Sequence, residues 1–204
     1  TTMHGRYLKP DGTAFYVTQS SDGDRIRKYT MSTPFDISTC SYDTIGTTQL
    51  RTDYSFYPAA IFFKPDGTRV FYLDGTNTSH CILRSYTLST PWDITGTMTE
   101  DSNSYDIHQY TGNVAIYSFT FKPDGTRFWT CDGNSTSAVY EFSLSSAWDL
   151  GNVSFVRQNS QTYSGYSNGY LSGISWKPDG TIFYPTHHGS SSLRQSTAST
   201  PWEA

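Results

Sequence analysis

One pentapeptide, Lys-Pro-Asp-Gly-Thr, occurs four times in this chain of 204 residues. The copies stand at 9–13, 64–68, 122–126 and 177–181. Proline presets the first corner of a tight turn, aspartate tolerates the second, and glycine supplies the positive φ that closes the reversal. Each copy therefore predicts a β-hairpin whose loop is a type I turn with a glycine bulge.

Aromatic and β-branched residues flank every copy of the pentapeptide. The flanking pairs and triplets are Tyr7-Leu8, Phe62-Phe63, Thr120-Phe121 and Ser175-Trp176 before the turns, and Phe15-Tyr16, Val70-Phe71-Tyr72, Phe128-Trp129 and Phe183-Tyr184 after them. Residues of this kind suit a pleated, half-buried surface, so both arms of each hairpin are predicted to be strands.

A second signature, Ser-Thr-Pro-Trp-Asp or a close variant, follows a third predicted strand in every repeat. Its copies stand at 32–36, 89–93, 145–149 and 199–203, and the turn glycines are 55, 58 and 55 residues apart. Four short strands in a period just above 50 residues are typical of β-propeller blades. No window has a sustained helical period, so almost no helix is expected.

These repeats predict an all-β fold, a β-propeller of four blades with about 55 residues and four antiparallel strands each. The expected blades are residues 1–52, 53–108, 109–163 and 164–204, which together form one domain. Small residues stand four positions before each repeated lysine: Gly5, Ala60, Ser118 and Gly173. They are expected on the first strand of each blade, where neighbouring blades crowd together and need close backbone approach.

The stretch FFKPDGTRVFYLDG…ILRSYTLSTPWDIT, at 62–95, resembles the short β-propeller repeats of many phage and marine bacterial surface proteins. At greater distance it is similar to the lactonase-like (YVTN-like) propellers. The resemblance covers nearly the whole chain and implies the propeller fold. It does not imply one activity, since propellers serve as enzymes, lectins and scaffolds.

Composition excludes several classes of function. The net charge is −4 and the basic residues are scattered, which argues against a nucleic-acid-binding surface. No apolar run is long enough to insert into a membrane. The three cysteines lack metal-binding spacing, and Cys81 and Cys131 are expected to be buried or free thiols, with a disulfide between them as the alternative. Sequons at Asn77, Asn134 and Asn152 matter only in a glycosylating host.

The last repeat stops at Trp202-Glu203-Ala204, before any fourth strand. Three outcomes are open: a four-bladed ring with one incomplete blade, a fragment of a longer array, or a part-ring completed by another copy. An open strand edge is a template for association, so self-assembly or covalent continuation is favoured over a free monomer.

A possible chemical site is formed by the loops between second and third strands. Aligned on the loop glycines, the equivalent residues are Asp22, Asp74, Asp132 and His188. Such a ring could hold Ca²⁺ or another divalent cation, or serve a lactonase-like hydrolase with metal-bound water. Yet Asp-Gly is also the ordinary chemistry of turns, and no nucleophile motif accompanies the His187-His188 pair.

A binding surface is the stronger hypothesis for function. Six tyrosines lie in connections expected on one face: Tyr54, Tyr57, Tyr110, Tyr163, Tyr166 and Tyr170. Tyrosine among Ser, Gly and Asn is the composition of adaptable recognition surfaces, and aromatic faces suit sugar rings. The alternative is that these rings only fill the seams between blades.

The sequence therefore favours a non-enzymatic β-propeller of the cell exterior or virion surface. It would be a structural or adhesive protein that self-assembles, as a homo-oligomer or fibre, through open blade edges, and it would contact glycans through its tyrosines. No cofactor is expected apart from Ca²⁺ at the ring described above. The competing hypothesis is a metal-dependent, lactonase-like hydrolase on the propeller axis.

Overall fold

The computed structural model describes residues 3–19, 23–50, 58–74, 80–112, 116–132, 138–160, 171–187 and 192–203. Within this part of the chain the regular structure is β-strand, apart from the four-residue helix α1 (His108–Thr111) and 3-10 turns at Ile37–Thr39 and Leu150–Asn152. The predicted fold class is confirmed, because each repeat forms one small antiparallel sheet in a β-propeller arrangement. The last sheet is three strands wide.

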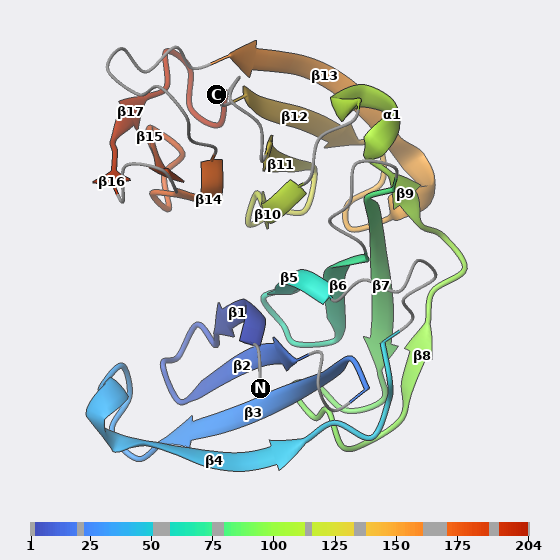
Figure 1. Ribbon diagram of the computed structural model, residues 1–204, viewed down its shortest axis with the longest axis vertical. Coiled ribbons are helices and arrows are strands. Elements are labelled where there is room, and N and C mark those ends of the chain that lie inside the picture. Colours follow the sequence, from blue (N-terminus) through green and yellow to red (C-terminus); the bar gives the residue numbers. More distant parts are fainter. Residues whose placement is uncertain are drawn as a thin grey trace. The chain divides into compact units, whose positions relative to one another are not determined.

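The chain divides into two compact units, and the first comprises Thr1–Gly75 with Ile82–Ser104. It holds blade 1, with strand order β1-β2-β3-β4, and blade 2, with strand order β5-β6-β7-β8 (Figure 1). Their bounds are β1 (Met3–Leu8), β2 (Ala14–Gln19), β3 (Arg25–Met31), β4 (Cys40–Ile45), β5 (Pro58–Phe63), β6 (Arg69–Asp74), β7 (Ile82–Leu88) and β8 (Met98–Glu100).

The second unit comprises Thr76–Cys81 with Tyr105–Ala204. It holds the short strand β9 (Tyr105–Asp106), helix α1 and blades 3 and 4. Blade 3 has the strand order β10-β11-β12-β13. Blade 4 has the order β14-β15-β16, and β17 also pairs with β15. The bounds are β10 (Ile116–Phe121), β11 (Arg127–Asp132), β12 (Ala138–Leu144), β13 (Val153–Ser160), β14 (Leu171–Trp176), β15 (Ile182–His187), β16 (Ser192–Leu193) and β17 (Ser196–Thr197). The single-domain interpretation stays a prediction.

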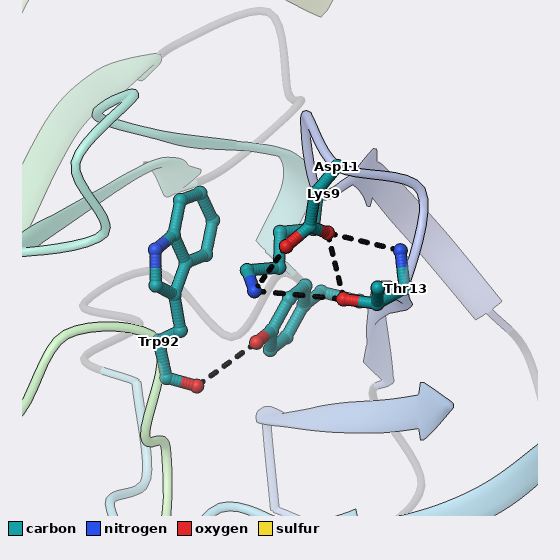
Figure 2. Close-up of polar contacts among 5 residues, drawn as sticks. Lys9, Asp11, Thr13 and Trp92 are labelled. Carbon is teal, nitrogen blue, oxygen red and sulfur yellow. Dashed lines mark hydrogen bonds and ion pairs between the residues drawn. The ribbon is translucent and has the colours of Figure 1, made fainter. Parts of the chain in front are cut away.

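The pentapeptide turns have the predicted geometry. In the first, the Gly12 amide donates to the Lys9 carbonyl oxygen at 2.8 Å, and Gly12 has φ of 71°. The Asp11 carboxylate accepts from the Thr13 amide at 3.0 Å and from the Lys9 ammonium at 2.6 Å (Figure 2). The other three copies repeat these bonds, so lysine, aspartate and threonine brace the turn that proline and glycine shape.

The aromatic residue of the second signature lies on the turn glycine of its own blade. The four pairs are Gly12 with Phe35, Gly67 with Trp92, Gly125 with Trp148 and Gly180 with Trp202. In each pair the aromatic residue has φ between 63° and 67°, in the left-handed region, and its amide donates to the glycine carbonyl at 2.8–3.0 Å. The two signatures therefore form one structural device that ties the hairpin tip to the end of the third strand.

Neighbouring blades pack face to face. In the first unit, a Cβ on Gly5 would lie 2.7 Å from the backbone of Ala60, which confirms the predicted close approach of first strands there. The Tyr16 ring lies 4.5 Å from the Phe63 ring, and its hydroxyl donates to the Trp92 carbonyl at 2.9 Å. This packing forms a buried core of aromatic and branched side chains from both blades.

The second unit has the same arrangement. Trp129 of blade 3 lies 4.8 Å from Trp176 and 5.9 Å from Trp202 of blade 4, measured between ring centroids. Cys131 is buried in this core, and Cys81, the last residue of the unit's first segment, is also buried. The two cysteines do not form a disulfide, so the expectation of buried thiols holds.

Candidate functional site

The acidic residue predicted at the end of β6 is buried within blade 2. Asp74 is fully buried, and its Oδ2 accepts a hydrogen bond from Arg84 Nε at 2.9 Å. The Arg84 side chain is itself 6% exposed and lies 3.5 Å from the Glu100 carboxylate. Two buried charges that pair with each other offset part of their desolvation cost, and removal of one leaves its partner buried and poorly compensated. Asp74 therefore has a scaffold role in this geometry.

Strand register gives a different set of equivalent positions from the loop glycines. The last residue of the second strand is Gln19 opposite Met3, Asp74 opposite Pro58, Asp132 opposite Ile116, and His187 opposite Leu171. Asp22 and His188 lie outside the described residues. In blades 1 and 4 the residues at the Asp74 position are therefore Gln19 and His187, both buried. Among the residues that are described, no group of three or more His, Cys, Asp or Glu could hold a metal ion.

One of the six predicted binding tyrosines is described. Tyr110 belongs to α1, and its ring stacks on Phe155 with centroids 4.7 Å apart and planes 16° apart. The Tyr105 and Phe142 rings also lie near it, with centroids 6.3 and 5.8 Å away. The side chain is 39% exposed, so a ligand can reach only the part that these rings leave open. The other five, Tyr54, Tyr57, Tyr163, Tyr166 and Tyr170, lie outside the described residues.

An open polar hollow of about 370 Å³ lies over the outer strands of blade 2, at the Arg84 guanidinium. Its other lining residues are Glu100, Asp101, Ser102 and Ser104. Asp101 accepts hydrogen bonds from Ser85 at 2.5 Å and from Thr87 at 2.8 Å. These carboxylates are engaged by the sheet, so the hollow suits water or a small polar molecule better than a metal.

A second hollow of about 230 Å³ lies between blades 3 and 4. Its lining residues are Arg157, Asn159, Phe183, Ser196, Thr197, Ser199 and Glu203. Arg157 donates to the buried Glu141 at 2.9 Å and lies 3.4 Å from Glu203, so its charge joins the two blades. The sequence analysis predicted neither hollow. The only sequence signal was a charged residue within a strand, Arg84 in blade 2 and Arg157 in blade 3.

Large exposed apolar side chains are unevenly distributed over the described chain. The large ones are Leu8, Phe35, Ile37, Tyr42, Tyr110, Val156 and Leu193. Five of these seven belong to blades 1 and 4, which carry the first and last repeats. Single exposed apolar residues are common on protein surfaces. An exposed apolar residue whose equivalents in the other blades are buried requires an explanation.

The fold and these surfaces define a β-propeller protein. A β-propeller domain of Cps50 (Swd1) from Myceliophteria thermophila matches 97% of this chain, with a TM-score of 0.57 and 10% sequence identity. The periplasmic gluconolactonase PpgL of Pseudomonas aeruginosa matches 96%, with a TM-score of 0.56 and 14% identity. A protein from Lactobacillus plantarum matches 97%, with a TM-score of 0.58 and 11% identity. At these identities the similarity concerns the fold alone.

This chain spans only part of the structures that it resembles. It covers 54% of the Cps50 domain chain, 49% of the gluconolactonase chain and 67% of the Lactobacillus protein. No protein-family model matches the sequence, and no curated protein matches it. Within the described part of the chain, no helix has the length and apolar character needed to cross a bilayer.

Proposed function

We propose that this chain is a non-enzymatic, self-assembling β-propeller protein with a structural or adhesive role outside the cell or on a virion. The observation that carries the proposal is the set of exposed apolar side chains on the blades with the first and last repeats: Leu8, Phe35, Ile37 and Tyr42 in blade 1, and Leu193 in blade 4. Exposed apolar side chains that gather on one face are typical of protein interaction sites. The surface location rests on the resemblance of the repeats to phage and marine bacterial surface proteins.

The predicted metal ring receives no support from Asp74, its one member with a described side chain. That carboxylate is buried and bonded to Arg84, so it is not presented to a ligand. Glycan contact remains part of the adhesive proposal through Tyr110, whose ring stacks on Phe155 while part of the side chain stays exposed. A partly exposed tyrosine offers an aromatic face with a polar hydroxyl, which suits a sugar ring.

Two measurements test the proposed function. Light scattering across a concentration series should give a native mass above that of the 22.9 kDa monomer, rising with concentration. A monomer at every concentration would contradict self-assembly. A glycan array should show binding that Tyr110→Ala weakens, and an array without binding would remove the glycan part alone.

The alternative function is metal-dependent lactone hydrolysis, suggested by the similarity to the gluconolactonase of Pseudomonas aeruginosa. Hydrolysis of gluconolactone with added Ca²⁺ or Zn²⁺, abolished by Asp132→Asn, would replace the first proposal. Asp132 is the better probe because Asp74→Ala is expected to destabilise blade 2.

A further inference from the structure

Each blade presents two chemically distinct faces to its neighbours. The back face carries the residue before the turn lysine: Leu8, Phe63, Phe121 or Trp176 in blades 1 to 4. The forward face carries the residue four positions after the turn glycine: Tyr16, Phe71, Trp129 or Tyr184. Side chains alternate across a strand, so residues paired in register share a face.

Contacts between blades in each unit join a forward face to a back face. Tyr16 of blade 1 lies 4.5 Å from Phe63 of blade 2. Trp129 of blade 3 lies 4.8 Å from Trp176 of blade 4. Two different pairs of blades therefore use the same positions and nearly the same separation, which makes this contact a property of the repeat.

Among the described residues, the forward face of blade 4 is more exposed than the forward faces of the other blades. Leu193 is paired with Thr186 and shares that face with Tyr184. The equivalent residues of the other blades are Ile26, Leu83 and Val139, which are 1%, 0% and 1% exposed, whereas Leu193 is 71% exposed. Tyr184 is half-buried, whereas Tyr16, Phe71 and Trp129 are fully buried.

The back face of blade 1 also has exposed apolar side chains among the described residues. Leu8 pairs with Phe15, Phe15 with Tyr29, and Tyr29 with Tyr42, which places one apolar residue of each strand in a row. Leu8 is 42% and Tyr42 52% exposed, whereas Phe63, at the position of Leu8 in blade 2, is fully buried. Phe35, which packs on Gly12 at the tip of the hairpin, is 64% exposed, while its counterpart Trp92 packs against Tyr16 of the neighbouring blade.

We infer that the back face of blade 1 binds the forward face of blade 4 of a second copy of this chain. This inference rests on the proposed self-assembly and specifies its geometry. The second copy is the partner because it carries the forward-face surface that the repeat already pairs with a back face twice within one chain. Such a contact is heterologous, so copies associate head to tail and form a closed ring or a filament. Blade faces make the contact, and strand edges need not pair.

Two lysine substitutions block the faces one at a time. Leu8→Lys blocks the back face and Leu193→Lys the forward face, and both positions are exposed, so the fold should tolerate them. Each variant alone should stay monomeric in sedimentation velocity, at concentrations where the wild-type chain is larger. A 1:1 mixture should form a dimer and nothing larger, because one intact back face then meets one intact forward face.

Val156→Lys is the matched control, since Val156 is 41% exposed and lies on the outer strand β13. It should assemble like the wild type, and circular dichroism should show all variants folded. If the Leu8→Lys and Leu193→Lys variants assemble like the wild type, the inference is overturned, although self-assembly stands. A 1:1 mixture of the two variants that stays monomeric would also overturn the inference. A wild-type chain that is monomeric at every concentration would overturn both proposals, because blades of the same or a longer chain would then cover the two faces.

Discussion

The indole of Trp92 lies against the α-carbon of Gly67, in the space that any side chain at residue 67 would need. Both residues have φ in the left-handed region, 66° and 76°, and the Trp92 amide donates to the Gly67 carbonyl at 3.0 Å. Glycine adopts this conformation readily, but tryptophan does so only when its surroundings compensate. The ring's contact with Phe63 at 5.4 Å and with Lys9 at 5.5 Å offers that compensation.

Gly67→Ala should destabilise blade 2 more than strained backbone alone would. The left-handed conformation costs a residue with a Cβ about 1–2 kcal/mol, and overlap with the Trp92 ring adds to this. Gly23→Ala is the matched control, because Gly23 has φ of 75° but its nearest neighbour, the Gln49 side chain, is 3.8 Å away. Urea unfolding of dilute samples should rank Gly67→Ala below Gly23→Ala in stability. Equal losses would mean that the ring contact contributes nothing.

Trp92→Ala should cost more stability than Phe35→Ala, although the two residues occupy the same place in their blades. Trp92 packs against Tyr16 and Phe63, so its loss opens a gap between blades and should cost about 2–4 kcal/mol. Phe35 is 64% exposed, and in a dilute monomer its loss should cost less than about 1 kcal/mol. Chemical denaturation of both variants at the same low concentration measures the difference, and a reversed order would contradict this packing.

Asp74→Ala should destabilise the fold by about 3 kcal/mol, because it removes the buried carboxylate of Asp74 and leaves the Arg84 guanidinium only the partly exposed Glu100, 3.5 Å away. Arg84→Met removes the other charge, and the double variant should lose less than the sum of the two single losses. A double-mutant cycle of unfolding free energies measures this coupling. Additive losses would show that the pair does not act as a unit.

The turn carboxylates should make stability depend on acidity below about pH 4. Hydrogen bonds from the Lys9 ammonium, then from Thr13, lower the pKa of Asp11 from 3.8 to about 2. A depressed folded-state pKa contributes stability above pH 3.8, and this is lost as the pH falls toward 2. Asp11→Asn should therefore unfold at a lower Tm than the wild type at pH 4, and the difference in Tm between the two proteins should shrink as the pH falls to 2. A constant deficit across that range would contradict the role of the charge.

The blades and their turns could be predicted from the sequence because the decisive interactions are local. Lys9, Asp11 and Thr13 lie within one pentapeptide, and their bonds need nothing from elsewhere in the chain. The link between Gly67 and Trp92 joins residues of two separate motifs across the blade, so the sequence revealed both motifs without their contact. Only the fold shows that one motif covers the other.

The candidate metal ring shows why the site was harder to predict. Alignment on the loop glycines makes Asp22 equivalent to Asp74, whereas strand register makes Gln19 equivalent to Asp74, because Gln19 lies opposite Met3 as Asp74 lies opposite Pro58. Burial also changes what a residue offers, and the sequence could not show that Asp74 points into the sheet toward Arg84. Similarly, Leu193 and Ile26 are both aliphatic residues at equivalent positions, so the sequence does not distinguish them. Only the structure shows that Ile26 is buried and Leu193 is exposed.

Cross-linking between copies tests the assembly most directly. Leu8 is equivalent to Phe63 and Trp176, and Tyr184 is equivalent to Tyr16 and Trp129. Within the chain, the ring centroids of Phe63 and Tyr16 are 4.5 Å apart, and those of Trp176 and Trp129 are 4.8 Å apart. In a Cys40→Ser background, a mixture of Leu8→Cys and Tyr184→Cys chains treated with a short bismaleimide should give a covalent dimer containing one of each. Neither variant alone should give that dimer, and a mixture without the mixed product would contradict head-to-tail assembly through the two faces.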